Sequence, residues 1–445
     1  MKRRSLIFTG VGFGAVLFAA AAFGTVQSRS ESPAPPAAAL AGPAESEGFA
    51  RISGASLERT IASLQARLKQ SPTDYVSWAT LGLAYVQQAK VSVNSDFYPL
   101  AQGTLEKSLA INTDDNFLAY AGLSALSSAR HNFAEAKAYA EQGLKINEYN
   151  AILYGALSDA QSQLGDYSGA SASVQRMLEL NPNTASLSRA SYIRELKGDV
   201  EQAGTLMQRA LDDAPKASDR AFALYYLGEL AFNGGDANGA LTYYRRALDA
   251  SPSDSAALAG KAKAEAALGQ YLTALDDYAV VVQQTPEPSY LIEYGELLQS
   301  LGRQDEADQQ YAIFATTERL FESNGVAPDS VQTLFYANHG QPDAAMIDAD
   351  KGIATRPFLA MYDAYAWALH VNGRDAEALI AVNRALSTGM RNASFHFHKG
   401  MINLALGDRE GARAELEQAL AINRNFSPLD APIALETLAQ LESLP

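Results

Sequence analysis

Three side chains in this sequence, Asp363, His370 and His398, are of types that bind metal ions. Imidazole nitrogens and carboxylate oxygens are ordinary Zn²⁺ ligands, and a site needs at least three of them. His370 and His398 are expected to reach one inner surface, and Asp363, in the same predicted helix as His370, is the conceivable third ligand. His396 points about 200° away from His398 on a helix, so the two cannot bind one ion together. His396 occupies the repeat position of Trp78 and is assigned to the core. A metal-binding or enzymatic role for the His370/His398 region is therefore one hypothesis.

Other kinds of chemistry are poorly represented. The chain has no cysteine, which excludes disulfides, thiolate metal sites and cysteine nucleophiles. It contains no GxSxG elbow, no P-loop, no GxGxxG fingerprint and no HExxH pair. Residues 348–352 (DADKG) resemble the start of a calcium loop, but the third acid and the closing glutamate are missing. The sequence predicts a protein that is not an enzyme, with no catalytic residue, cofactor or dedicated metal site.

The charge balance also excludes a class of partner. The formal net charge is −15, so duplex nucleic acid is repelled on average. No cluster of lysines and arginines with interleaved aromatics is present to follow a phosphate backbone. We expect no nucleic-acid partner.

The first residues indicate export. Lys2, Arg3 and Arg4 precede an uncharged, apolar stretch that ends in small residues, as in a cleaved signal peptide. The same stretch is long enough to remain as a single N-terminal membrane anchor, and this alternative stays open. Both alternatives predict an extracytoplasmic location: periplasmic, secreted, or membrane-anchored and facing outward. A Pro/Ala/Ser-rich stretch follows and is expected to be a disordered tether.

Small residues recur through the chain at intervals of 33 to 38 residues. An alanine stands twelve residues after each, and in eight units a glycine lies between the two. Such a period indicates a solenoid of stacked units. Each unit is interpreted as helix, turn and helix, with the two small residues where the helices cross most closely. The first small residues are Ser124, Ser158, Ser191, Gly228, Ala262, Gly295, Thr333, Ala366 and Gly400.

This pattern resembles the tetratricopeptide repeat, whose motif is W-x2-L-G-x2-Y followed by A, F or Y, A and P. Trp78, Leu81, Gly82 and Tyr85 stand in that order and spacing. The layout is also similar to exported bacterial tetratricopeptide proteins of unassigned function, through residues 97–99 (FYP) and 426–429 (FSPL). The ten units begin near Tyr75, Phe117, Ala151, Thr184, Ala221, Ser255, Pro288, Val326, Leu359 and Ala393.

The expected fold is an all-α solenoid of about ten helix-turn-helix units, with a capping helix at the end. A longer step near residue 325 predicts either a hinge or a longer helix and loop without mobility. The predicted segments are a signal or anchor (1–27), a tether (28–54), a leading helix (55–74), repeats 1 to 7 (75–325), repeats 8 to 10 (326–426) and the cap (427–445).

The resemblance implies a right-handed superhelix whose first helices line a concave face, with repeat positions two, five, nine and twelve pointing inward. These positions are aromatic and acidic here, which favours a protein or peptide partner with basic segments. The alternative is that the aromatics only pack between repeats, and a structural tether or assembly factor at the cell envelope is a further alternative. The candidate groove residues are Asp159, Tyr192, Glu195, Tyr225, Glu229, Phe232, Lys263, Glu296, Trp367, His370 and Phe397.

Overall fold

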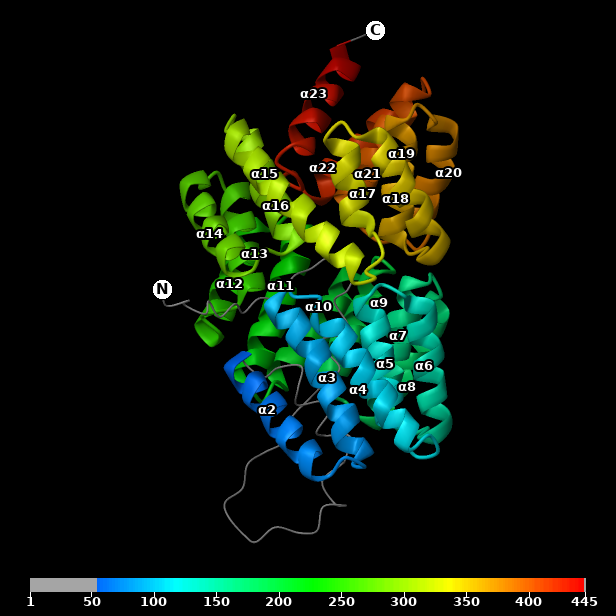
Figure 1. Cartoon of the computed structure of the whole chain (residues 1–445). Helices are drawn as coiled ribbons and strands as arrows, with labels where there is room; N and C mark the ends of the chain where they lie inside the picture. Colours follow the sequence, from blue (N-terminus) through cyan, green and yellow to red (C-terminus); the bar gives the residue numbers. More distant parts are fainter. Residues whose placement is uncertain (1–53, 444–445) are drawn as a thin grey trace.

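The computed structural model describes residues 54–443, and every regular element in this range is an α-helix (Figure 1). The expected signal or anchor and nearly all of the expected tether lie outside the described residues. The helices are α2 (Gly54–Gln70), α3 (Tyr75–Ser92), α4 (Phe97–Ile111), α5 (Phe117–Ala129), α6 (Phe133–Ile146), α7 (Ala151–Gln163), α8 (Tyr167–Leu180), α9 (Thr184–Glu195), α10 (Val200–Asp212), α11 (Ala217–Asn233), α12 (Ala237–Ala250), α13 (Ser255–Ala267), α14 (Tyr271–Gln284), α15 (Pro288–Ser300), α16 (Gln304–Ser323), α17 (Ser330–Asn338), α18 (Pro342–Thr355), α19 (Leu359–Val371), α20 (Asp375–Ala385), α21 (Ala393–Ala405), α22 (Arg409–Ile422) and α23 (Asp430–Ser443).

Helices α3 to α22 form ten consecutive pairs, called here repeats 1 to 10, and each helix packs mainly on its neighbours in sequence. Helix α2 packs on α3 at one end of the array, and α23 packs on α22 at the other. The predicted all-α fold of stacked helix pairs is confirmed.

The small residues lie where the paired helices cross. The hydroxyl of Ser124 on α5 donates to the carbonyl of Ala136 on α6 at 2.8 Å, and Ser191 does the same to Ala203 at 2.7 Å. Both pairs are twelve residues apart, the offset seen in the sequence. A side-chain oxygen can reach the neighbouring backbone only because the two helices approach closely, so larger residues at these positions would separate the helices.

In repeats 3 to 10 the turn inside the repeat contains a glycine with positive φ, and in repeats 3, 4, 5 and 10 the aspartate after it caps the next helix. Gly165 has a φ of +75°, a left-handed conformation that glycine adopts at low steric cost. Asp166 follows, and its carboxylate accepts the backbone N–H of Gly169 at 2.9 Å, which caps α8. The glycine therefore ends one helix, and the residue after it begins the next.

The array makes more than one superhelical turn, and the second turn rests on the first. In Figure 1, repeats 8 to 10 (α17 to α22) lie above the blue and cyan helices of repeats 1 to 3. The amide of Ala327, before repeat 8, donates to the carbonyl of Arg130 at 3.1 Å, inside repeat 2. The amide of Leu359, at the start of repeat 9, donates to the hydroxyl of Tyr167 at 2.9 Å, inside repeat 3. The short loops between the paired helices of early repeats therefore contact the loops that precede late repeats.

Contacts between the two superhelical turns recur along their length, and each joins residues separated by a similar number of positions in the sequence. This line of contacts is called the seam below. Asn423, before α23, donates through Nδ2 to the carbonyl of Phe232 in repeat 5 at 2.8 Å, across 191 residues. A Cβ at Gly198 in repeat 4 would lie 2.2 Å from the carbonyl oxygen of Gly389, before repeat 10. A Cβ at Gly165 would lie 2.7 Å from the carbonyl oxygen of Pro357. Backbone thus meets backbone at this seam, which leaves no room for a side chain.

The longer step near residue 325 comes from α16, which has 20 residues, and from the loop after it. That loop is attached to the first turn: the Asn324 amide group donates to the hydroxyl of Ser95 at 3.0 Å, and Ala327 bonds to Arg130. These contacts favour the longer helix and loop over the hinge.

The seam predicts a difference between two glycine substitutions of the same kind. Gly198 and Gly302 have φ of +74° and +75°, but a Cβ at Gly302 meets nothing within 4 Å. Both G198A and G302A incur the left-handed backbone cost of about 1 kcal/mol. We expect G198A to lower the free energy of unfolding by roughly 1–3 kcal/mol more, because its methyl group forces the turns apart. Urea unfolding followed by circular dichroism measures both, and equal destabilisation would contradict the seam.

Candidate functional site

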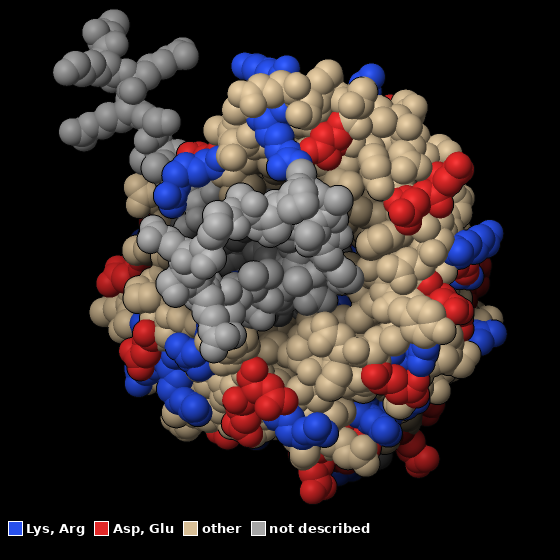
Figure 2. Space-filling view, turned by 90° about the horizontal axis from the view of Figure 1, so that it is seen from below, with Lys and Arg blue, Asp and Glu red and all other residues tan. Residues whose placement is uncertain are grey.

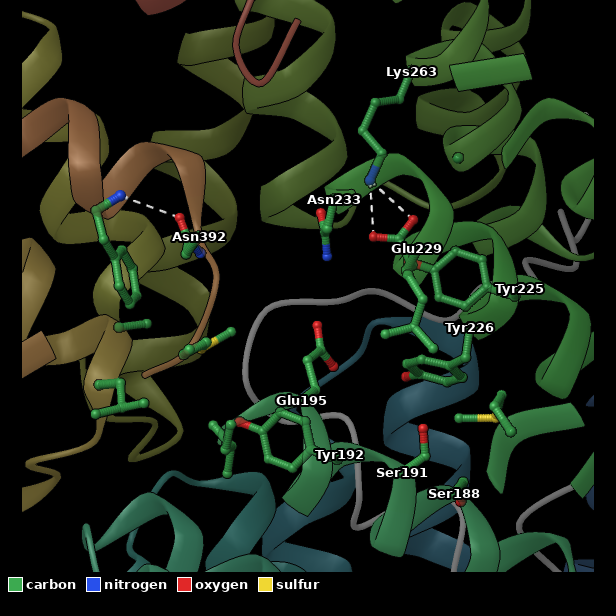
Figure 3. Close-up of a pocket in the computed structure, with 18 of the residues that line it drawn as sticks. Ser188, Ser191, Tyr192, Glu195, Tyr225, Tyr226, Glu229, Asn233, Lys263 and Asn392 are labelled. Atoms are coloured by element: carbon green, nitrogen blue, oxygen red, sulfur yellow. Dashed lines mark hydrogen bonds and ion pairs between the residues drawn. The ribbon is translucent and has the colours of Figure 1, made fainter. Parts of the chain in front are cut away.

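A cavity of about 330 Å³, called here the inner pocket, lies between the two superhelical turns (Figure 3). One wall consists of the first helices of repeats 4 to 7, namely α9, α11, α13 and α15. The other wall comes from residues before and within α19 and α21 of the second turn. The polar and aromatic lining residues are Ser188, Ser191, Tyr192, Glu195, Tyr225, Tyr226, Glu229, Asn233, Lys263, Tyr290, Glu293, Phe358, Asn392 and Phe395.

An ion pair between Glu229 and Lys263 joins repeats 5 and 6 in this pocket. The Lys263 ammonium donates to both carboxylate oxygens of Glu229 at 2.9 Å and lies 4.8 Å from the ring centroid of Phe232. The hydroxyl of Tyr244 donates to the same carboxylate at 2.5 Å. Burial opposes the charge of Lys263, but Glu229 and Glu293 outweigh burial and raise its pKa, so the ammonium stays ionised.

The negative charges of two further carboxylates in the inner pocket are less well balanced by nearby positive charge. Burial raises the pKa of Glu195 to about 7, the charge of Glu229 adds to the effect, and a hydrogen bond with Asn233 opposes it. Burial also raises the pKa of Glu293, against the nearby charge of Lys263. The lining therefore holds three carboxyl groups and one ammonium, and a second positive charge entering the pocket would favour ionisation of the remaining acids.

A second cavity of about 390 Å³, called here the outer pocket, shares Lys263 and Glu293 with the first. Phe232 and Glu296 line it from the first turn, and the loop and helix at the end of the array, α23, close its other side. Burial raises the pKa of Glu296 to about 8, with Asp430 and Glu293 adding to the shift. The inner and outer pockets adjoin at their two shared residues, and together they are called the groove below.

The structure brings most of the predicted groove residues together. The inner pocket contains five of them, and Phe232, Lys263 and Glu296 line the outer pocket. Asp159 lies elsewhere, buried in a bidentate ion pair with Arg189 at 2.6 and 2.9 Å. The five residues of the inner pocket are Tyr192, Glu195, Tyr225, Glu229 and Lys263.

Trp367, His370 and Phe397 form a separate aromatic cluster with His398. The ring of Trp367 stacks on both histidine rings, at 4.7 Å for His370 and 4.3 Å for His398, and lies 5.8 Å from Phe397. Nδ1 of His370 pairs with Asp375 at 2.5 Å. These residues therefore connect repeats 9 and 10 and do not line either pocket.

The three residues of the hypothetical metal site, Asp363, His370 and His398, do not converge on one point. Asp363 bonds with both oxygens to Nδ1 of His398 at 2.9 Å and not to His370. Within residues 54–443, no group of three His, Cys, Asp or Glu side chains could hold a metal ion. The assignment of His396 to the core and of His398 to the inner surface was wrong: His398 is 2% exposed, and His396 is half-buried beside Glu415.

Sequence reasoning missed one repeat position. Arg189, Tyr226 and Glu293 all occupy position six, counted from the start of each repeat. Tyr226 and Glu293 line the inner pocket, and Arg189 pairs with Asp159, a position-nine residue. Positions two, six, nine and thirteen are spaced by four, three and four, so helical periodicity alone could have found them. The wall from the second turn has no such signal in the sequence.

Comparison with known proteins agrees with this architecture. Tetratricopeptide repeat models match residues 156–218, 197–255, 225–287 and 393–426. No curated protein matches the chain. Similar solved structures include a tetratricopeptide repeat protein from Parabacteroides merdae, with 20% identity over 58% of this chain and 99% of that one, at a TM-score of 0.34. Two others are the APC/C hetero-tetramer Cut9–Hcn1, with 14% identity, 91% and 90% coverage and a TM-score of 0.42, and yeast Tom70, with 14%, 86% and 97% and a TM-score of 0.34.

The fold and groove define a helical repeat scaffold. The matched residues fall on repeats 3 to 6 and on repeat 10, and the same helix pair recurs through the rest of the array. The chain is a tetratricopeptide repeat protein.

The buried pair of His398 and Asp363 predicts a pH-dependent contribution to stability. Burial opposes protonation of His398, but Asp363, with help from Asp430, outweighs burial and raises its pKa. The stabilisation is therefore complete below the unfolded pKa of about 6.5 and is lost as pH rises through the folded value. We expect H398Q to lower the free energy of unfolding more at about pH 5.5 than at about pH 8.5. Urea titrations at the two pH values measure this, and an equal penalty at both would refute it.

Proposed function

We propose that this protein is an extracytoplasmic scaffold for protein–protein interaction and that its groove binds a basic, extended segment of a partner. The observation that carries the proposal is the charge of the groove. Glu195, Glu229 and Glu293 face the inner pocket, where Lys263 is the single lysine or arginine among the described lining residues, and Glu296 and the exposed Arg424 line the outer pocket. A lysine or arginine of a partner would supply the missing positive charge.

The aromatic lining suits the same partner. Tyr192, Tyr225, Tyr226 and Tyr290 surround the carboxylates (Figure 3 labels the first three). Tyrosines supply a large contact area at small entropy cost, and their ring faces attract cations. Lys263 shows this mode of binding within the chain itself, with its ammonium between the Glu229 carboxylate and the Phe232 ring.

The outer surface lacks a comparable feature on the face seen in Figure 2. There, acidic and basic side chains are interspersed around the rim, and neither kind gathers into an extended patch. The net charge of −15 attracts basic partners over a distance, while the groove supplies the short-range contacts.

The extracytoplasmic location rests on the sequence of the first residues, where Lys2, Arg3 and Arg4 precede the apolar stretch. Within residues 54–443, none of the helices combines the length and apolar character needed to cross a bilayer. We propose that the repeat array lies outside the cytoplasm, either released by signal cleavage or held by one N-terminal anchor.

Two other roles are less well supported. A metal-dependent or enzymatic role would need the His370 and His398 region, whose imidazoles pair with Asp375 and Asp363 instead of converging. A tether whose length matters would be extended, whereas here the second superhelical turn folds back onto the first. We therefore propose a binding role rather than a catalytic one.

The charge of the groove can be tested with a double variant. E195Q/E293Q removes two carboxylates that hold no ion-pair partner among the described ion pairs, while the Glu229–Lys263 pair remains. We expect its affinity for lysine- and arginine-rich peptides to fall roughly tenfold, which equals about 1.4 kcal/mol. Affinity for these peptides should also rise with pH in the wild type, since Glu195 ionises near a pKa of about 7 and Glu296 near about 8. Fluorescence anisotropy with a labelled peptide measures both effects.

The matched control is E148Q/E201Q, which removes two exposed carboxylates and leaves the groove intact. Net charge changes equally in both double variants, so the control separates the groove from general attraction. Loss of affinity in both variants to the same degree would show that the groove is not the binding site.

Location is tested separately by N-terminal sequencing of the protein purified from its natural envelope and soluble fractions. We expect either a new N-terminus after the apolar stretch or an intact chain confined to the membrane fraction. An intact chain in the soluble cytoplasmic fraction would contradict export without affecting the groove.

A further inference from the structure

The inner pocket has the size and the enclosure of a small-molecule binding site. Its volume of about 330 Å³ falls in the range of roughly 300–1,000 Å³ that such sites occupy. The first helices of repeats 4 to 7 form one wall, and residues of the second superhelical turn form the other. A molecule bound in this pocket is therefore in contact with both turns.

Negative charge is in excess in the lining of the inner pocket. Its charged side chains are Glu195, Glu229, Glu293 and Lys263, and the second turn contributes only uncharged residues. When all four groups are ionised, the described lining carries an excess of two negative charges. A ligand with two positive charges would neutralise this excess, because each ammonium group can pair with one carboxylate.

The two carboxyl groups that account for the excess lie on either side of the Glu229–Lys263 ion pair along the array. Glu195 is on α9 and Glu293 is on α15, whereas the ion pair joins α11 and α13 between them. Each bonds to a neutral side chain, an amide for Glu195 and a tyrosine hydroxyl at 3.1 Å for Glu293. Both are half-buried and line the cavity. A linear molecule with ammonium groups along its length matches this arrangement better than a compact cation does.

Aromatic rings line much of the space between these carboxyl groups. Ring faces attract ammonium groups, and apolar surface favours contact with methylene groups. Lys263 shows the same combination within the chain, since it is a primary amine on an aliphatic stem. Its ammonium pairs with Glu229 and lies 4.8 Å from the ring centroid of Phe232. The aromatic residues of the inner pocket are Tyr192, Tyr225, Tyr226, Tyr290, Phe358 and Phe395.

We propose that the inner pocket is a binding site for a free linear polyamine, an aliphatic chain that carries two or more ammonium groups. The ammonium groups pair with Glu195 and Glu293, and the Glu229–Lys263 ion pair stays intact. This inference goes beyond the proposed function, because it uses the charge of the same pocket but needs no protein partner. A bound polyamine contacts both superhelical turns, so it also stabilises their closure.

Binding of a polyamine is coupled to proton release. Burial raises the pKa of Glu195 to about 7, the charge of Glu229 adds to the shift, and a hydrogen bond with Asn233 opposes it. Burial also raises the pKa of Glu293, against the nearby charge of Lys263. The second turn places no charged residue in the lining. An ammonium group that enters the pocket lowers both pKa values and so displaces protons from these carboxyl groups.

The test is isothermal titration calorimetry of the full chain with spermidine and with butylamine, near pH 7 and at an ionic strength held constant with sodium chloride. We expect saturable binding of spermidine and roughly tenfold or more weaker binding of butylamine, because a single ammonium group leaves one carboxylate unpaired. Titrations in phosphate and in Tris, whose enthalpies of ionisation differ, measure the protons released. We expect roughly half a proton or more per spermidine, since Glu195 is about half protonated near pH 7.

Variants locate the binding site. E195Q/E293Q is expected to weaken spermidine binding by roughly tenfold or more and to abolish proton release. E148Q/E201Q, which removes two exposed carboxylates, is expected to keep both. If E195Q/E293Q does not fold, judged by circular dichroism, E195Q alone is expected to lose most of the proton release.

Three results would overturn the proposal: no saturable binding of spermidine to the wild type, equal affinities for spermidine and butylamine, or an equal loss of affinity in the two double variants. Proton release that is unchanged in E195Q would equally refute the site. Peptide binding without spermidine binding overturns this inference alone. Spermidine binding without peptide binding overturns the proposed function alone.

Discussion

Close approach of backbones at small residues is the constraint on which this structure depends. Within a repeat, Ser191 reaches the carbonyl of Ala203 because neither position carries a bulky side chain. Between turns, Gly198 faces the carbonyl of Gly389 at a distance that admits no Cβ. The first contact sets the angle between paired helices, and the second holds one superhelical turn against the next. Packing of this kind tolerates little change in volume, since interiors are close-packed.

The groove is a consequence of that closure. A single superhelical turn would leave the first helices of repeats 4 to 7 facing water, where their carboxylates would be ordinary surface groups. The second turn adds Phe358, Leu359 and Phe395 as an opposite wall and removes water from around Glu195 and Glu293. Desolvation then raises the pKa of both acids and makes a cation a favourable occupant. Chemistry in the groove therefore depends on contacts made nearly two hundred residues apart.

Polar groups at the seam contribute alignment as well as stability. Asn423 and Tyr167 each meet a backbone group of the other turn, and such bonds are lost if the turns slide by one repeat. The buried pair of Arg189 and Asp159 similarly links repeats 3 and 4 in one register. A hydrophobic contact alone is less selective, because it is non-directional, whereas a hydrogen bond needs its partner at one distance and angle. Arg356 belongs to the same set, since its Nε donates to Gln163 of the other turn.

The sequence by itself determined the repeated helix pair, since small residues twelve apart, turn glycines and capping acids are local signals of known period. It also placed Tyr192, Glu195, Tyr225, Glu229 and Lys263 on one surface, because they recur at fixed positions of a repeat. It could not place Arg356 beside Phe133 or Phe358 beside the groove. The rise and curvature of the superhelix result from small angles between neighbouring helix pairs, which accumulate over many repeats and are not visible in the sequence. It also misassigned His396 and His398, whose orientations depend on Glu415 and Asp363 in neighbouring helices. Local periodicity is encoded residue by residue, but the meeting of distant turns is decided only by the packing of the whole array.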